Sequence, residues 1–225
     1  MALILNIETS SPVCSVCLAK DGMLIDFRED LKGNSHAKIL TIFIDELFSK
    51  NKISIAELDA VAVSAGPGSY TGLRIGTSVA KGLCYALNKP LIAVPTLLSL
   101  ATGIQQKQNI SSAYYMPVMD ARRMDVYTTI FDSSLNEVRK TSCATLNEEF
   151  EKSLDGLGNI YIGGNAANKC RQVFTLGNFT FNEEIYCDSR NMVSISHKKY
   201  LNNEFENMAY FEPFYLKEFP AVARN

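Results

Sequence analysis

The 225-residue sequence has few histidines, no long apolar run and no dense cluster of basic residues. Its longest apolar stretches, such as DAVAVSAG and PLIAVP, are far shorter than the roughly 18 residues that a membrane-spanning helix needs. The N-terminal stretch MALILNIETSS has no basic region before its apolar residues, as a secretory signal peptide would have. We therefore expect a cytoplasmic protein with no membrane contact.

Basic residues are too few, and too scattered, for a protein that grips nucleic acid by itself. Lysine and arginine number 22 against 24 aspartates and glutamates, which gives a net charge of −2. Proteins that bind nucleic acid alone normally carry a basic patch, because contacts to phosphates supply much of their affinity. If this protein works on RNA, we expect a partner to hold the RNA.

The histidines and cysteines do not form a metal-binding pattern. His36 and His197 lie far apart, and the sequence has no His-x-x-x-His pair. Six cysteines without a secretory signal favour reduced thiols over a disulfide framework. Cys14 and Cys17 resemble half of a zinc knuckle, but no second pair follows, and in a strand they point to opposite faces. We predict no metal site and expect His36 to cap a helix or make a hydrogen bond.

The first half of the chain predicts the element order β-β-β-α-β-α-β-α. Strands are expected over ALILNIE and over CSVCLAKDGMLIDFRE, the latter divided by an Asp-Gly hairpin turn. Apolar residues recur at helical spacing over residues 35–50, where Ser35 is available as the N-cap. LDAVAVSAG and LIAVP predict buried strands; LRIGTSVAKGLCYALNK and TLLSLATGI predict helices, the second capped by Thr96.

A weaker repeat of this order follows a polar stretch, QQKQNISS, that predicts a linker. Strands are expected over YYMPVMD, MDVYTTIFD, LNEVRK and NIYIGGN, and helices over LNEEFEKSL and AANKCRQVF. Two such halves in tandem are typical of the α/β ribonuclease-H-like fold of actin, sugar kinases and heat-shock ATPases, in which nucleotide sits between two lobes. We expect a first lobe over residues 1–104, with the glycine-rich loop and partner helices, and a degenerate second lobe over 105–225.

Several stretches together resemble the bacterial TsaB (YeaZ) family. They are the opening LNIETSSPVCSVCL, the helix start SHAKIL, the long element SAGPGSYTGLRIG, then PLIAVPTLLSLA, the hairpin PVMDARRMDVYTTIF and the tail EPFYLKEF. The resemblance is dense over residues 1–104 and thinner beyond. The glycine-rich string is specific, because it is long and lies between a predicted strand and a predicted helix.

This resemblance implies a non-catalytic subunit. Members of the family pair with the related enzyme TsaD, and that complex, with the small ATPase TsaE, attaches threonylcarbamoyl from threonylcarbamoyl-adenylate to the adenosine beside the tRNA anticodon. The resemblance also implies that tRNA is reached only through the complex and that the isolated chain forms a homodimer. It implies no cofactor on this chain alone, with nucleotide binding left open at the complex interface.

The strand ends predict an incomplete nucleotide site. Glu8 ends the first strand, where an acid would hold a metal, and the neighbouring hydroxyls could donate to a phosphate. The matching turn of the second half, DARRMD, has no glycine, and its bulky side chains would keep backbone amides away from a polyphosphate. There Asp120 is either an acid of the site or a cap of the hairpin, and Gly163 either faces an adenosine or ends a strand. The candidate nucleotide-facing residues are Glu8, Thr9, Gly68, Ser69, Asp120, Gly163 and Gly164.

The glycine-rich loop and two helices are predicted to serve partner docking. The helix after the loop carries small residues, which permit close approach of another helix, although packing within its own lobe explains them equally well. The helix over residues 36–49 has more apolar positions than one core face requires, which leaves a second strip for a partner. The candidate partner-binding residues are His36, Leu40, Phe43, Leu47, Tyr70, Arg74, Gly76, Ser78 and Ala80.

Glu8 and the glycine-rich loop keep a second function open, that of a stand-alone small-molecule kinase or ATPase of the same superfamily. No Gly-x-Ser-x-Gly nucleophile motif occurs in the sequence, and GPGSYTG is not of that form. We therefore predict no catalytic nucleophile, and we do not expect the glycoprotease activity that older names of the family suggest.

Overall fold

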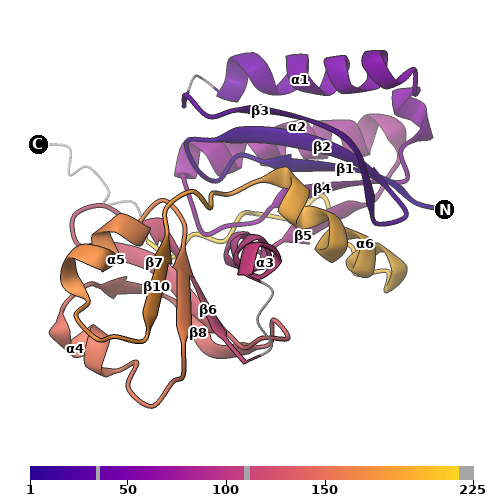
Figure 1. The fold of residues 1–225 in the computed structure, drawn as a ribbon. Helices are drawn as coiled ribbons and strands as arrows, with labels where there is room; N and C mark the ends of the chain where they lie inside the picture. Colours follow the sequence, from indigo (N-terminus) through magenta and orange to yellow (C-terminus); the bar gives the residue numbers. More distant parts are fainter. Residues whose placement is uncertain (34–35, 109–111, 218–225) are drawn as a thin grey trace, which may run out of the picture.

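The computed structural model describes residues 1–33, 36–108 and 112–217, and Figure 1 shows two sheets with helices packed against them. The first sheet has the order β3-β2-β1-β4-β5. Its antiparallel half is β3-β2-β1, and β4 and β5 continue it in parallel with β1. The strands are β1 (Leu3–Glu8), β2 (Cys14–Lys20), β3 (Met23–Asp30), β4 (Ala60–Ser64) and β5 (Leu91–Val94).

The hairpin between β2 and β3 forms at the predicted Asp-Gly turn. Asp21 and Gly22 have φ angles of 50° and 77°. These left-handed conformations suit a two-residue turn whose twist matches the strands. Cys14 and Cys17 are buried on opposite faces of β2, as the alternation of a strand requires.

Two long helices cover one face of the first sheet. They are α1 (His36–Asn51) and α2 (Tyr70–Leu87), and a 3-10 turn, η1 (Ile55–Glu57), precedes β4. Leu40 and Leu47 of α1 pack with Val61 and Val63 of β4 in one core cluster. The opposite face is covered by residues from the end of the chain, η2 (Ser189–Met192) and α6 (Val193–Leu201).

The second sheet repeats the order of the first. Its order is β10-β9-β6-β7-β8, with β6-β7-β8 antiparallel and β9 and β10 parallel to β6. The helices after β8 and β9 are much shorter than α1 and α2, so the second copy is reduced, as predicted. The elements are β6 (Tyr114–Asp120), β7 (Asp125–Phe131), β8 (Glu137–Thr145), α4 (Glu148–Lys152), β9 (Ile160–Gly163), α5 (Ala167–Val173) and β10 (Phe179–Asn182).

The structure corrects the predicted connection between the two sheets. Helix α3 (Thr96–Gln108) runs through the first four residues of the expected linker, and the rest of that stretch falls partly outside the described residues. Thr96 is the first residue of this helix and not its N-cap, and its hydroxyl accepts a hydrogen bond from the amide of Gly66 at 3.0 Å. The predicted N-cap Ser35 lies outside the described residues. Strand β10, η2 and α6 were not predicted.

Helix α6 affects where the chain can be divided into two lobes. It packs against β5 and β1 of the first sheet, although it follows the second sheet in sequence. The division into lobes at 104 and 105 stays a prediction.

In the ranges that the structure describes, none of the helices has the length and apolar character needed to cross a membrane.

Candidate functional site

The glycine-rich element packs directly on the turn between β1 and β2. The amide of Ser69 donates to the carbonyl oxygen of Ser10 at 2.6 Å. A Cβ atom on Gly68 would collide with that same carbonyl, and one on Gly72 would collide with the carbonyl of Thr9. Glycine is therefore needed here for close backbone approach within the chain itself.

The start of α2 is already occupied by groups of the chain. The hydroxyl of Ser69 accepts from the amide of Gly72 at 3.2 Å and so caps the helix. In a phosphate-binding loop these amides would point at the anion instead. The amides of Ser69 and Gly72 are therefore already paired within the chain.

Glu8 lies at the base of this arrangement and is fully buried. One carboxylate oxygen accepts from the amide of Ser10 at 2.7 Å, and burial raises the pKa of the Glu8 carboxyl. Its other oxygen and the hydroxyls of Thr9, Ser10 and Thr77 are buried without a hydrogen-bond partner among the described residues. In the described ranges, no group of three or more His, Cys, Asp or Glu could hold a metal ion.

The second-lobe candidates have structural contacts of their own. Asp120 is exposed, accepts from the amide of Arg122 at 2.7 Å and pairs with Lys169 at 2.7 Å, so it caps the β6–β7 turn. Gly163 and Gly164 are buried. A Cβ atom on the former would press on Ile104 of α3, and one on the latter would strike the backbone of β6. Close packing of the strand end accounts for both glycines.

The candidate nucleotide-facing residues thus lie in two separate groups in the structure. Glu8, Thr9, Gly68 and Ser69 meet at the β1–β2 turn. In the second group, Asp120 and the two glycines meet at the ends of β6 and β9.

Most of the apolar stripe of α1 is used inside the chain. Leu40 and Leu47 are buried, and Ile39 and Phe43 are half-buried against the same core. The prediction of a wide second strip on this helix needs correction, since Ile42, at 53% exposure, is its only exposed large apolar residue among those described. The helix contacts β2, β3 and α2, so it needs apolar residues over more of its circumference than a helix packed on one sheet.

The small residues of α2 divide between two faces. Gly76 and Ala80 are buried, the former against Thr9, so neither is available on the surface. Ser78 and Gly82 are exposed. A Cβ atom on Gly82 would meet no atom within 4 Å in the described part of the chain. Residues spaced four apart on a helix share a face, so Arg74, Ser78, Gly82 and, one turn on, Tyr85 define one outward stripe. We call these four residues the α2 stripe.

An aromatic stack orders the first turn of α2. The guanidinium of Arg74 lies 4.2 Å from the ring centre of Tyr70, and the ring of Tyr70 lies 4.9 Å from that of Tyr215. At these distances the stack restrains the Arg74 side chain at the surface. At the start of α1, Nε2 of His36 donates to the carbonyl oxygen of Ser11 at 2.8 Å, which joins that helix to the β1–β2 turn.

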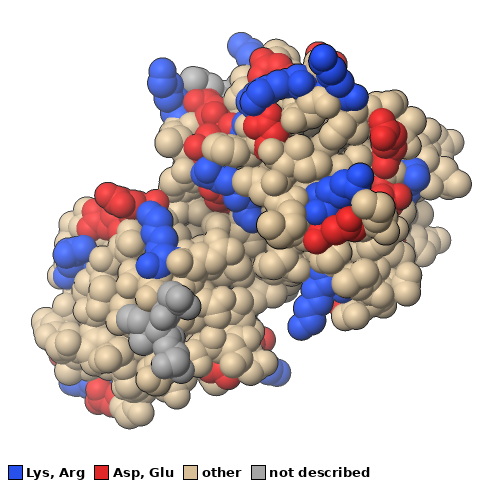
Figure 2. Space-filling model, turned by 45° about the vertical axis from the view of Figure 1, so that its right-hand side comes forward, with Lys and Arg blue, Asp and Glu red and all other residues tan. Residues whose placement is uncertain are grey.

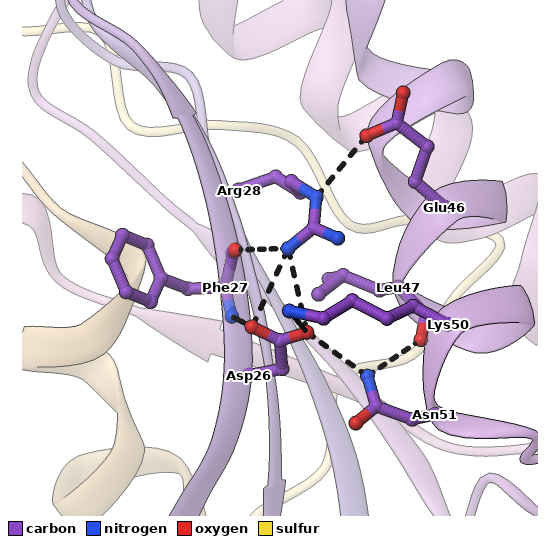
Figure 3. Close-up of polar contacts among 7 residues, drawn as sticks. All are labelled: Asp26, Phe27, Arg28, Glu46, Leu47, Lys50 and Asn51. Carbon is purple, nitrogen blue, oxygen red and sulfur yellow. Dashed lines mark hydrogen bonds and ion pairs between the residues drawn. The ribbon is translucent and has the colours of Figure 1, made fainter.

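A polar cluster attaches α1 to the edge strand β3 (Figure 3). Asp26 of β3 accepts from Lys50 at 2.8 Å and from Asn51 at 3.1 Å, both near the end of α1. Arg28 of β3 pairs with Glu46 at 3.1 Å. The hydrogen bond from Lys50 is the main reason that the pKa of Asp26 falls to about 2. The cluster holds the C-terminal half of α1 against β3.

Three residues of this region, Gly82, Tyr215 and Lys217, were not among the predicted site residues. Gly82, like Ser78, faces outward, whereas Gly76 and Ala80 face inward, and this difference depends on the orientation of the helix on the sheet. Tyr215 and Lys217 reach the site from the tail motif EPFYLKEF, whose sequence did not predict which part of the fold they contact.

On the face seen in Figure 2, positive and negative side chains are interspersed over both lobes, without a large patch of one sign.

The repeated sheet order, with the glycine-rich element between β4 and α2, defines a tandem ribonuclease-H-like fold of the kind found in actin and sugar kinases. A protein-family model described as TsaD, tRNA N6-adenosine threonylcarbamoyltransferase, matches residues 31–215. The structure of YeaZ from Pseudomonas aeruginosa superposes with a TM-score of 0.82 at 22% identity, over 96% of this chain and 100% of that one. This likeness concerns the fold.

Two curated relatives carry the name TsaB. The tRNA threonylcarbamoyladenosine biosynthesis protein TsaB of Escherichia coli is 30% identical over 135 residues, which are 60% of this chain and 57% of that protein. The match thus spans little more than half of that relative. The protein of the same name from Buchnera aphidicola (Baizongia pistaciae) is 27% identical over 225 residues, covering 96% of this chain and 98% of the relative. The chain belongs to the TsaB (YeaZ) family.

Proposed function

We propose that this chain is a non-catalytic subunit for tRNA threonylcarbamoyladenosine synthesis and that it docks the threonylcarbamoyltransferase TsaD through α1 and the α2 stripe. The observation that carries the proposal is the exposed pair Ser78 and Gly82. A glycine inside a helix costs up to about 1 kcal/mol relative to alanine, and no packing within the described chain explains Gly82. Close approach of a partner helix would explain it.

The packing of the glycine-rich element supports a non-catalytic role. Its glycines admit the backbone of the β1–β2 turn, so their close contacts are made within the chain itself. The second-lobe turn has bulky exposed Arg122 and Arg123 at the corresponding place. Both features favour retention of the element for backbone geometry and docking.

The remaining partners follow from the same proposal. TsaE acts on the complex, tRNA is reached only through it, and nucleotide binds, if at all, at the interface. Without TsaD the exposed faces of α1 and α2 pair with a second copy of the chain. The protein works in the cytoplasm.

Binding to TsaD of the same organism tests the docking surface. Ser78→Glu would place an unpaired charge in the buried interface, and we expect affinity to fall by roughly a thousandfold, because such a charge costs several kcal/mol. Ser194→Glu is the matched control, since Ser194 is an exposed serine on α6 of the opposite face. Leu47→Glu and charged substitutions of Gly76 are unsuitable, because both positions are buried. Native affinity of a folded Ser78→Glu variant would place the docking surface elsewhere.

The buried carboxyl of Glu8, with one unpaired oxygen, keeps a kinase or ATPase as the alternative function. The purified chain would then hydrolyse ATP, and Glu8→Ala would abolish hydrolysis. On our proposal the chain alone neither hydrolyses ATP nor modifies tRNA when given threonylcarbamoyl-adenylate. Either activity in the pure chain would contradict the assignment.

A further inference from the structure

The segment after α6, residues 206–217, contacts both lobes, and we propose that it is a strap that positions the first turn of α2 relative to the second lobe. Figure 1 shows this yellow segment running from α6 across the molecule between the two sheets. The inference rests on the function proposed above, because it concerns the geometry of the same docking surface. Tyr215 and Lys217 are the positioning residues.

The strap is first attached along the first lobe. The amide of Glu206 donates to the carbonyl of Leu91 at 2.9 Å, which adds a bridge beside β5. Met208 and Phe211 pack against the core that α1 and α2 share, and Lys81 of α2 donates to the carbonyl of Phe211 at 3.2 Å. The strap therefore follows α2 before it reaches the glycine-rich element.

At the glycine-rich element the strap contacts both backbone and side chains. The amide of Phe214 donates to the carbonyl of Ala65 at 2.7 Å, and its own carbonyl lies so close to Gly66 that a Cβ atom there would collide with it. The next residue, Tyr215, stacks on Tyr70 and so supports the Arg74 side chain of the α2 stripe.

The strap ends on the second lobe. The ammonium of Lys217 donates to the carbonyl of Ala121 at 2.9 Å and to the carboxylate of Asp125 at 2.6 Å. The other oxygen of Asp125 accepts from Thr145 of β8 at 2.7 Å, so this acceptor is held by the second sheet. Only one residue, Leu216, separates Tyr215 from Lys217, and a short connection transmits displacement of one lobe to the other.

A cavity lies where the lobes meet, so the connection through the strap contributes more to their relative position there. It has a volume of about 360 Å³ and is lined by Pro67 and Leu97 of the first half, Phe131 and Thr141 of the second, and Phe214 of the strap. Direct packing between the halves is incomplete at this place, so fewer contacts fix their relative position there. The strap spans the gap with hydrogen bonds at both ends.

Hydrogen exchange in the free chain and affinity for TsaD test the strap together. Lys217→Met removes the ammonium and keeps the stem, Lys217→Arg keeps the charge, and Tyr215→Ala removes the stack. We expect Lys217→Met and Tyr215→Ala to speed exchange in peptides covering residues 65–76 and 211–217 and to weaken binding about threefold to tenfold. Lys217→Arg should keep exchange rates and affinity for TsaD close to those of the wild-type chain. Lys152→Met removes an exposed ion pair within α4 and should change neither.

The outcomes separate the strap from the proposed function. Unchanged exchange at residues 65–76 in both Lys217→Met and Tyr215→Ala would overturn the strap, and so would faster exchange with native affinity. Failure of the wild-type chain to bind TsaD would count against the docking function. The exchange rates of the free chain would then still decide whether residues 206–217 couple the lobes.

Discussion

At the scale of single residues, Asp26 is the side chain whose ionisation is most clearly tied to the fold. It accepts hydrogen bonds from Lys50 and Asn51 of α1 and is only 15% exposed. We expect Asp26→Asn to lower the free energy of unfolding by about 1–2 kcal/mol at pH 7, because a charged acceptor is replaced by a neutral one. Asp45→Asn, at an exposed position of the same helix, should have little effect.

The pH dependence of this difference follows from the lowered pKa of Asp26. A carboxyl whose pKa is lower in the folded state stabilises the fold fully above its ordinary pKa of about 4. The stabilisation disappears as the pH falls towards about 2, where the folded group takes up its proton. Urea unfolding of the wild-type chain and of Asp26→Asn at several pH values measures this difference in the free energy of unfolding. A difference that stays constant down to pH 2 would show that Asp26 acts by shape alone.

At the scale of elements, the glycines of α2 have opposite roles, and alanine substitutions separate them. Gly82→Ala should stabilise the free chain by about 0.5–1 kcal/mol, because the new methyl group meets open space and the helix loses a flexible residue. Gly72→Ala should destabilise it by about 2 kcal/mol or more, since its methyl group would collide with the carbonyl of Thr9. Thermal unfolding by circular dichroism compares them. Loss of stability in Gly82→Ala would mean that Gly82 has a role inside the chain.

The elements of the first lobe were largely predictable, and their outward faces were not. Alternation and helical spacing predicted β1 to β5, α1 and α2, because those periods reflect burial against one sheet. The same spacing could not tell that α1 also packs on α2, so Leu40 and Leu47 looked equally suited to a partner. For the nucleotide candidates, the glycine string predicted a tight strand-to-helix turn. It could not show that the chain's own carbonyl groups fill the space beside it.

At the scale of the whole molecule, the sequence predicted two sheets but not how the chain returns from one to the other. Helix α6 has few buried apolar residues, and its pattern gives no hint that Ile195, with Met192 of η2, covers the first sheet. Local periodicity reports that a face is buried but not which element buries it. The strap was missed for the same reason, since its attachments are single hydrogen bonds and rings spread over residues 206–217.

This return of the chain predicts that the first lobe does not fold by itself. A fragment of residues 1–108 keeps α1 and α2 but lacks the cover over Ile4, Ala62 and Ile92 on the other face of the sheet. Burial of apolar area is the main stabilising term of a domain, so an open sheet face should abolish cooperative unfolding. We expect the fragment to show no thermal transition by circular dichroism and to regain one on mixing with residues 112–217. A chain of residues 1–217 is the control, because it keeps all the described contacts. If residues 1–108 alone melt cooperatively near the temperature of that control, the first lobe folds by itself, and α6 and the strap add little to its stability.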